Sequence, residues 1–180
     1  MTARITGLCA AVGWVGLFFV GPTPVAAQVA THISAAELDS TIAAAPEGRV
    51  SDQQIRMVDV GGMNLGVGVV HRPETTTLTA IQHHEQAEIY RVVAGHGVLV
   101  TSRVMTDARE LDPDGGTVRR LTGPSAFGTI QGGVSRTVGP GDIVFIPAGV
   151  AHGFSEITEA ITYIVYRVDP KQLVELKEGR

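Results

Sequence analysis

Two short segments of the chain gather imidazole and carboxylate side chains beside turn residues. The first, residues 82–90, reads Gln-His-His-Glu-Gln-Ala-Glu-Ile-Tyr. The second, residues 139–152, begins with Gly-Pro-Gly-Asp and ends at His152. Two imidazoles and one carboxylate form a facial set of three metal ligands, which leaves coordination positions open for substrate or water. These residue types therefore predict a mononuclear site for a divalent metal.

The candidate metal ligands all lie in these two segments: His84, Glu88 and His152, with His83 as the alternative to His84 and Gln82 as a weak further ligand. Glu88 stands inside an apolar strand pattern, where a carboxylate costs free energy unless it is paired or bound to metal. Tyr90 shares the face of Glu88 and is a candidate catalytic proton donor or ligand contact. The alternatives are ordinary solvated histidines and a tyrosine in the pocket wall.

His83 and His84 are adjacent, so in a strand they point to opposite faces and only one of them reaches the metal. Gln82 shares the face of His84, which favours His84 slightly. A β-bulge would instead present both rings. On the strand over 64–72, His71 shares a face with Val67 and is expected to be a hydrogen-bonded core histidine, with a place in the pocket as the alternative. Arg72 is expected on the opposite, solvated face.

The first 27 residues have the pattern of a secretory signal peptide. Arg4 precedes an uncharged apolar run over 5–20, and small residues at 25–27 favour cleavage after Ala27. A membrane anchor is the alternative, but the run of sixteen residues is shorter than the roughly 20 that a spanning helix needs. We expect a periplasmic or secreted protein without a stable membrane anchor.

Composition excludes several classes of protein. The chain has 14 Lys+Arg against 18 Asp+Glu, so it lacks the basic excess with which proteins bind nucleic-acid phosphates. Cys9 is the only cysteine, which excludes a disulfide framework, a zinc finger or an iron–sulfur cluster within one chain. The 22 glycines and 9 prolines favour many turns, and thus short strands over long helices.

The pattern of elements predicts an all-β domain, a jelly roll or small barrel, with a short helix at each end. The first helix begins at a Ser34/Glu37 capping box and runs over 35–45, and the second covers 171–177. Residues 107–133 are expected to form a long loop. The predicted strands cover 54–60, 64–72, 78–84, 88–93, 97–105, 134–138, 142–146, 152–157 and 161–168. The predicted parts are the signal peptide (1–27), the first helix with a leading strand (28–62), the barrel (63–170) and the tail (171–180).

The two polar segments resemble the two signature motifs of the cupin superfamily, and the resemblance covers 65–169. Pro140-Gly141, Pro147, Gly149 and His152 match the second motif at every spacing. In the first motif, the interval from Glu88 to Gly95 matches, but the His-x-His pair does not. A spacing of three residues before Glu88 makes the pair Gln82 and His84, and a spacing of four makes it Ile81 and His83. Glu156 also stands where the family often has asparagine.

The resemblance implies a double-stranded β-helix that holds one divalent ion per chain, with Zn, Mn, Fe, Ni and Cu as candidates. It also implies a small-molecule ligand and a homodimer. The expected function is that of an exported lyase, isomerase or dioxygenase acting on a small organic molecule. The alternative is a small-ligand-binding or dimerisation module without catalysis. Because a chain exported unfolded acquires its metal outside the cytoplasm, we expect zinc, manganese, nickel or copper before ferrous iron.

Overall fold

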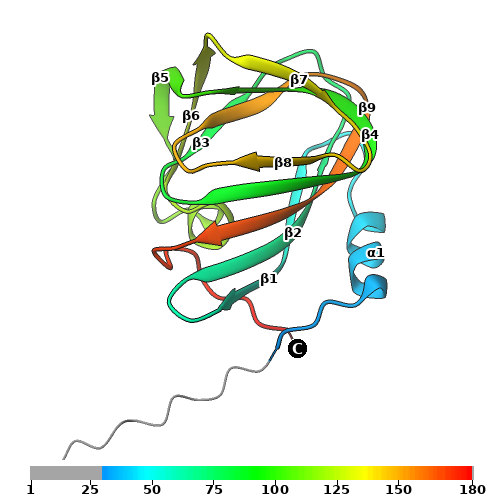
Figure 1. The fold of residues 1–180 in the computed structure, drawn as a ribbon, viewed down its shortest axis with the longest axis vertical. Helices are drawn as coiled ribbons and strands as arrows, with labels where there is room; N and C mark the ends of the chain where they lie inside the picture. Colours follow the sequence, from blue (N-terminus) through cyan, green and yellow to red (C-terminus); the bar gives the residue numbers. More distant parts are fainter. Residues whose placement is uncertain (1–29, 180) are drawn as a thin grey trace, which may run out of the picture.

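Antiparallel strands dominate the computed structural model, which describes residues 30–179 (Figure 1). The predicted signal peptide lies outside the described residues. The all-β prediction is confirmed. The elements, in chain order, are α1 (Ala35–Ala43), β1 (Ser51–Asp59), β2 (Asn64–Arg72), β3 (Ala80–His83), β4 (Ala87–Ser102), β5 (Val104–Glu110), the π-helical turn η1 (Val118–Thr122), β6 (Ser125–Gln131), β7 (Val134–Val138), β8 (Ile143–Ile146) and β9 (Ala151–Asp169). Within this range no helix combines the length and hydrophobicity needed to cross a membrane.

Two long strands, β4 and β9, pair with each other and belong to both layers of a jelly roll. The first half of β4 pairs with β8 and the second half with β7. The second half of β9 pairs with β2, which carries β1 at its other edge, while its first half lies beside β3. Strands β6 and β5 extend that second layer beyond β3. The apolar core fills the space between the layers.

The long strands bend where their register shifts around Gly95. Gly95 has a φ of 72°, in the left-handed region that favours glycine, and a Cβ atom there would overlap the backbone carbonyl of Ala160. The chain can therefore continue through this bend as one strand. For this reason the separately predicted strands over 88–93 and 97–105 merge largely into β4. Those over 152–157 and 161–168 likewise merge into β9.

We expect Gly95→Ala to lower the free energy of unfolding by about 2–4 kcal/mol, because it combines left-handed strain with a backbone clash. Gly48→Ala is a matched control: Gly48 has the same φ of 72°, but nothing lies within 4 Å of its added Cβ. The control substitution should lower the free energy of unfolding by only about 1 kcal/mol. Urea unfolding measures both values, and equal losses would show that the clash at the bend is relieved without cost.

Two sequence predictions about secondary structure, for residues 107–133 and 171–177, were wrong. The segment over 107–133 is not a long loop, because β5 continues to Glu110 and β6 pairs with both β3 and β5. The expected helix over 171–177 is also absent: Lys177 forms an isolated bridge to Met57 instead. A helix of seven residues has little stability of its own, so backbone pairing with β1 decides the conformation. The first helix forms as predicted, with Ser34 accepting a hydrogen bond from the Glu37 amide.

The faces of β2 are also the reverse of the prediction. Val70 belongs to the core cluster, and Arg72, two residues later, donates from Nε to the buried hydroxyl of Tyr163 at 3.0 Å. His71 lies on the other face, where its Nδ1 is 2.9 Å from the hydroxyl of Thr162. Arg72 is therefore directed toward the barrel interior rather than into solvent.

Candidate metal centre

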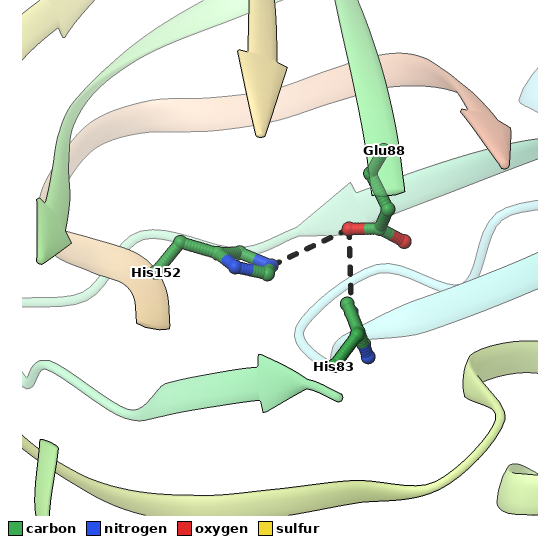
Figure 2. A group of neighbouring side chains, drawn as sticks. All are labelled: His83, Glu88 and His152. Carbon is green, nitrogen blue, oxygen red and sulfur yellow. Dashed lines mark ion pairs between the residues drawn. The ribbon is translucent and has the colours of Figure 1, made fainter. Parts of the chain in front are cut away.

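His83, Glu88 and His152 converge on one buried spot between the two layers (Figure 2). They come from the end of β3, the start of β4 and the start of β9. The Oε2 atom of Glu88 is 3.3 Å from Nε2 of each histidine, and all three ligand atoms lie within 4.8 Å of one another. Each of the three residues is less than 5% exposed. All three residues belong to the two polar segments identified in the sequence, residues 82–90 and 139–152.

Backbone pairing brings the two histidines together. Ile81 of β3 pairs with His152 of β9, so His83 lies two residues further along the same neighbouring strand. The turn before His152 is joined to β3 as well, since the Gly149 amide donates to the His83 carbonyl at 2.7 Å. Gly149 has a φ of 74°, which suits glycine in this tight turn. The Pro-x-Gly part of the second motif therefore places His152 against His83.

Hydrogen bonds to the outer ring nitrogens determine which nitrogen faces Glu88. Nδ1 of His152 is 3.0 Å from the carbonyl of Val150, which can only accept, so this nitrogen carries a proton. Nδ1 of His83 is 2.9 Å from the hydroxyl of Ser125. That hydroxyl has the carbonyls of Gly123 and Thr122 as acceptors for its own proton, so it accepts from His83. In their neutral forms, both rings therefore present an unprotonated Nε2 to the carboxylate.

This arrangement fits a divalent cation. Two nitrogen lone pairs and a carboxylate oxygen facing one another repel unless a proton or a metal ion lies between them. Nε2 of His152 is buried and has no hydrogen-bond partner among the described residues, although Glu88 is close. Burial lowers the pKa of His83, which favours its neutral form. Imidazole and carboxylate ligands suit zinc, copper, iron and nickel.

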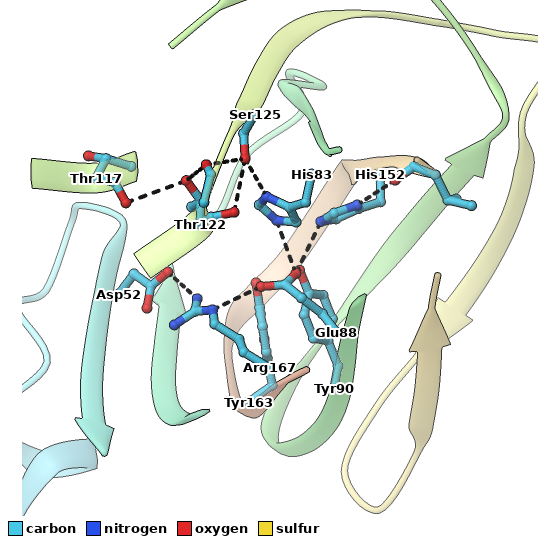
Figure 3. Close-up of polar contacts among 12 residues, drawn as sticks. Asp52, His83, Glu88, Tyr90, Thr117, Thr122, Ser125, His152, Tyr163 and Arg167 are labelled. Atoms are coloured by element: carbon cyan, nitrogen blue, oxygen red, sulfur yellow. Dashed lines mark hydrogen bonds and ion pairs between the residues drawn. The ribbon is translucent and has the colours of Figure 1, made fainter. Parts of the chain in front are cut away.

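Further hydrogen bonds hold Glu88, and its two carboxylate oxygens have different partners (Figure 3). Tyr90 donates to Oε2 at 2.8 Å, on the side of the histidines, and Arg167 donates from Nε to Oε1 at 3.1 Å. Burial raises the pKa of Glu88, but the two histidines and Arg167 outweigh it and hold the pKa well below its usual range. Burial and the Glu88 charge raise the pKa of Tyr90 well above its usual value, so Tyr90 stays protonated.

Arg167 is itself buried and joins Glu88 to strand β1. Its Nη1 donates to Gln54 at 2.6 Å and its Nη2 to Asp52 at 2.5 Å. None of these three residues was singled out in the sequence. Arg167 carried a usable signal, however: like Glu88, it is a charged residue inside an apolar strand pattern, where it needs a partner.

The remaining candidate ligands lie elsewhere. Nε2 of His84 is 2.8 Å from the carboxylate of Glu110, at the surface. Gln82, on the same face as His84, donates to the carbonyl of Gly149 at 2.7 Å. The structure thus brings the alternative, His83, to Glu88 and His152. This corresponds to the spacing of four residues before Glu88, with Ile81 in the place of the other histidine of the first motif.

A cleft of about 1200 Å³ lies beside this centre, between α1, β1, η1 and the C-terminal segment. None of the three candidate ligands lines it. Asp52 and Gln54 do line it, and both bind Arg167 on their inner side. Arg167 therefore lies between Glu88 and two of the residues that line the cleft.

No protein-family model matches the sequence, and no curated protein matches it either. Among solved structures, BH2720 from Bacillus halodurans is 15% identical, with 89% of each chain covered and a TM-score of 0.44. The DMSP lyase DddQ from Ruegeria pomeroyi is 20% identical over 76% of this chain and 51% of that one, with a TM-score of 0.40. A cupin 2 conserved barrel domain protein from Salinispora arenicola is 16% identical over 66% and 74% of the two chains, with a TM-score of 0.35.

The fold follows from the chain's own features. Its two antiparallel layers share β4 and β9, and the second motif ends at His152 beside His83 and Glu88. These features identify the chain as a protein of the cupin fold.

Proposed function

We propose that His83, Glu88 and His152 hold one divalent metal ion, and that the protein is an enzyme acting on a small organic molecule through that ion. The reaction class is lyase, isomerase or dioxygenase. One observation carries the proposal: two unprotonated imidazole nitrogens face a buried carboxylate, and that of His152 has no hydrogen-bond partner in residues 30–179. A bound divalent ion supplies Lewis-acid polarisation of a ligand oxygen or activation of a bound water.

The protein's own groups orient this site and control one proton. Ser125 and the Val150 carbonyl fix the two rings, and Arg167 engages Oε1 of Glu88 so that Oε2 faces the histidines. Tyr90 remains protonated and lies 2.8 Å from Oε2. Its hydroxyl can therefore give a hydrogen bond or a proton to a molecule bound beside Glu88, but it does not serve as a base at neutral pH.

A binding module without catalysis is the competing proposal. The near-complete burial of the three candidate ligands favours a role without catalysis, since a catalytic metal keeps a coordination position open to substrate. Turnover of any substrate by the metal-loaded protein decides for the enzyme. Tight binding of a small molecule that is released unchanged decides for the module.

Metal analysis tests the proposal directly. Protein isolated from the periplasm without metal-affinity purification should contain about one divalent ion per chain, because residues 30–179 offer one such centre. We expect zinc, manganese, nickel or copper in preference to iron. Elemental analysis gives the content, and metal far below one per chain after incubation with each ion would contradict the site. Iron near one per chain, with oxygen uptake on an organic substrate, would make the dioxygenase the first choice.

Export and homodimer formation are parts of the same proposal. The signal-peptide pattern over 1–27 supports export, and the cupin fold supports a dimer. The intact mass of the periplasmic protein should correspond to a chain that begins at Gln28, and light scattering should give twice that mass. A retained leader or a monomeric particle would reject the respective part.

A further inference from the structure

We infer that the metal-loaded site binds an anionic ligand, a carboxylate or similar oxyanion, and that Arg72 is the residue that anchors it. This inference rests on the proposed function and adds the chemical class of the ligand. It is carried by the hydrogen-bond donors of Arg72 and Tyr163 and by the balance of charge around Glu88.

Arg72 is an interior cation without a carboxylate partner. Its Nε donates to the Tyr163 hydroxyl, and its guanidinium carbon lies 5.9 Å from the centre of the Phe154 ring. Within residues 30–179, no carboxylate lies within 4 Å of its nitrogens, and neither terminal nitrogen has a hydrogen-bond acceptor. Arg167, by contrast, contacts both Asp52 and Glu88. Arg72 is half-buried and its terminal nitrogens are not fully enclosed, so they remain free to bind an anionic ligand.

The Tyr163 hydroxyl adds a third donor at the same place. It accepts the hydrogen bond from Arg72, so its own proton points elsewhere, and no described residue accepts that proton. The side chain is nearly fully buried, with an exposed fraction of 1%. Two terminal guanidinium nitrogens and one hydroxyl thus form a set of donors without acceptors. Such a fork of donors matches the geometry of a carboxylate.

This donor set lies close to the candidate metal centre. The Tyr163 ring packs on the Tyr90 ring with centroids 4.2 Å apart, and Tyr90 donates to Glu88. Three successive contacts therefore lead from Arg72 to the carboxylate that faces the histidines.

The charge balance points to the same class of ligand. Two arginines, Arg72 and Arg167, already balance two carboxylates, Asp52 and Glu88, while both histidines are neutral when they bind metal. Among these groups, a divalent ion therefore adds two positive charges that no carboxylate offsets. In a buried site, such an excess strongly favours an anionic ligand over a neutral one.

The test uses the full mature protein loaded with Co²⁺, whose visible spectrum reports ligand binding. Acetate, propionate and benzoate are titrated against their amides, which have nearly the same shape without the charge. We expect at least one carboxylate to bind about tenfold or more tightly than its amide. Arg72→Met should remove most of that preference, and Arg72→Lys should keep part of it. Arg91→Met, which removes an exposed cation from β4, should change nothing.

The outcomes separate the two proposals. The Co²⁺ content of each variant should stay near one per chain, which shows that the centre is folded and intact. Normal Co²⁺ uptake by the parent with equal binding of carboxylates and amides would overturn this inference alone. An unchanged preference in Arg72→Met would overturn the role of Arg72 in the same way. Failure of the parent to take up Co²⁺ would overturn the metal site and this inference together.

Discussion

Arg167→Met is expected to lower the free energy of unfolding by about 3–5 kcal/mol at neutral pH. The substitution keeps much of the side-chain volume but leaves the buried Glu88 and the half-buried Asp52 without their shared cation. Urea unfolding of the metal-free protein measures the loss. Arg119→Met is the matched control, because Arg119 pairs with Glu175 at the surface and should cost no more than about 1 kcal/mol.

The effect of Arg167→Met should also depend on pH with a defined sign. The pKa of Glu88 is lower in the folded protein than its usual value of 4.5. The charged carboxylate therefore contributes stability above about pH 4.5, and this contribution is lost as the pH falls toward the lowered pKa. Arg167 supplies part of the lowering of the Glu88 pKa. The difference in free energy of unfolding between variant and parent should therefore become smaller below pH 4.5. A loss of unfolding free energy that is small at neutral pH, or that is equal at pH 7 and pH 3, would refute the role of this ion pair.

His83→Ala and His84→Ala should differ sharply in metal affinity. His83→Ala should weaken binding by at least about 100-fold, because the loss of a ligand costs more than the loss of the groups that orient one. His84→Ala should stay within about threefold of the parent, since His84 contacts Glu110 at the surface. Competition with a chelating dye measures the affinities, and circular dichroism checks that each variant is folded.

The same pair of variants tests the conformation of β3. Equal losses of affinity would show that a bulge turns both rings inward, against the pairing of 80–83 with β6. A loss confined to His84→Ala would assign the metal to the other face of the strand. The further variant His152→Ala should weaken metal binding as much as His83→Ala, because both contribute one Nε2 to the same centre.

Features determined by local chemistry could be predicted from the sequence. Glycine- and proline-rich turns between short apolar runs predict an all-β chain, and the capping box predicts α1 at its observed start. The spacing of the second motif predicts a turn before His152, and Glu88 stands out as a charge in an apolar strand. Each of these signals depends on a few neighbouring residues, whose conformational preferences do not require knowledge of the rest of the chain.

Only the tertiary structure decided which face of each strand lies inside. Alternation places His83 opposite His84, and Arg72 opposite His71, but it does not say which member of each pair points inward. Pairing of β3 with β9 and of β2 with β9 settles this: it turns His83 toward Glu88 and Arg72 toward Tyr163. The strand β6 within 107–133 likewise depends on β3 and β5, because its hydrogen-bond partners lie on other parts of the chain. The Asp52–Arg167–Glu88 contacts join three strands, so they exist only once the sheet that contains them has formed.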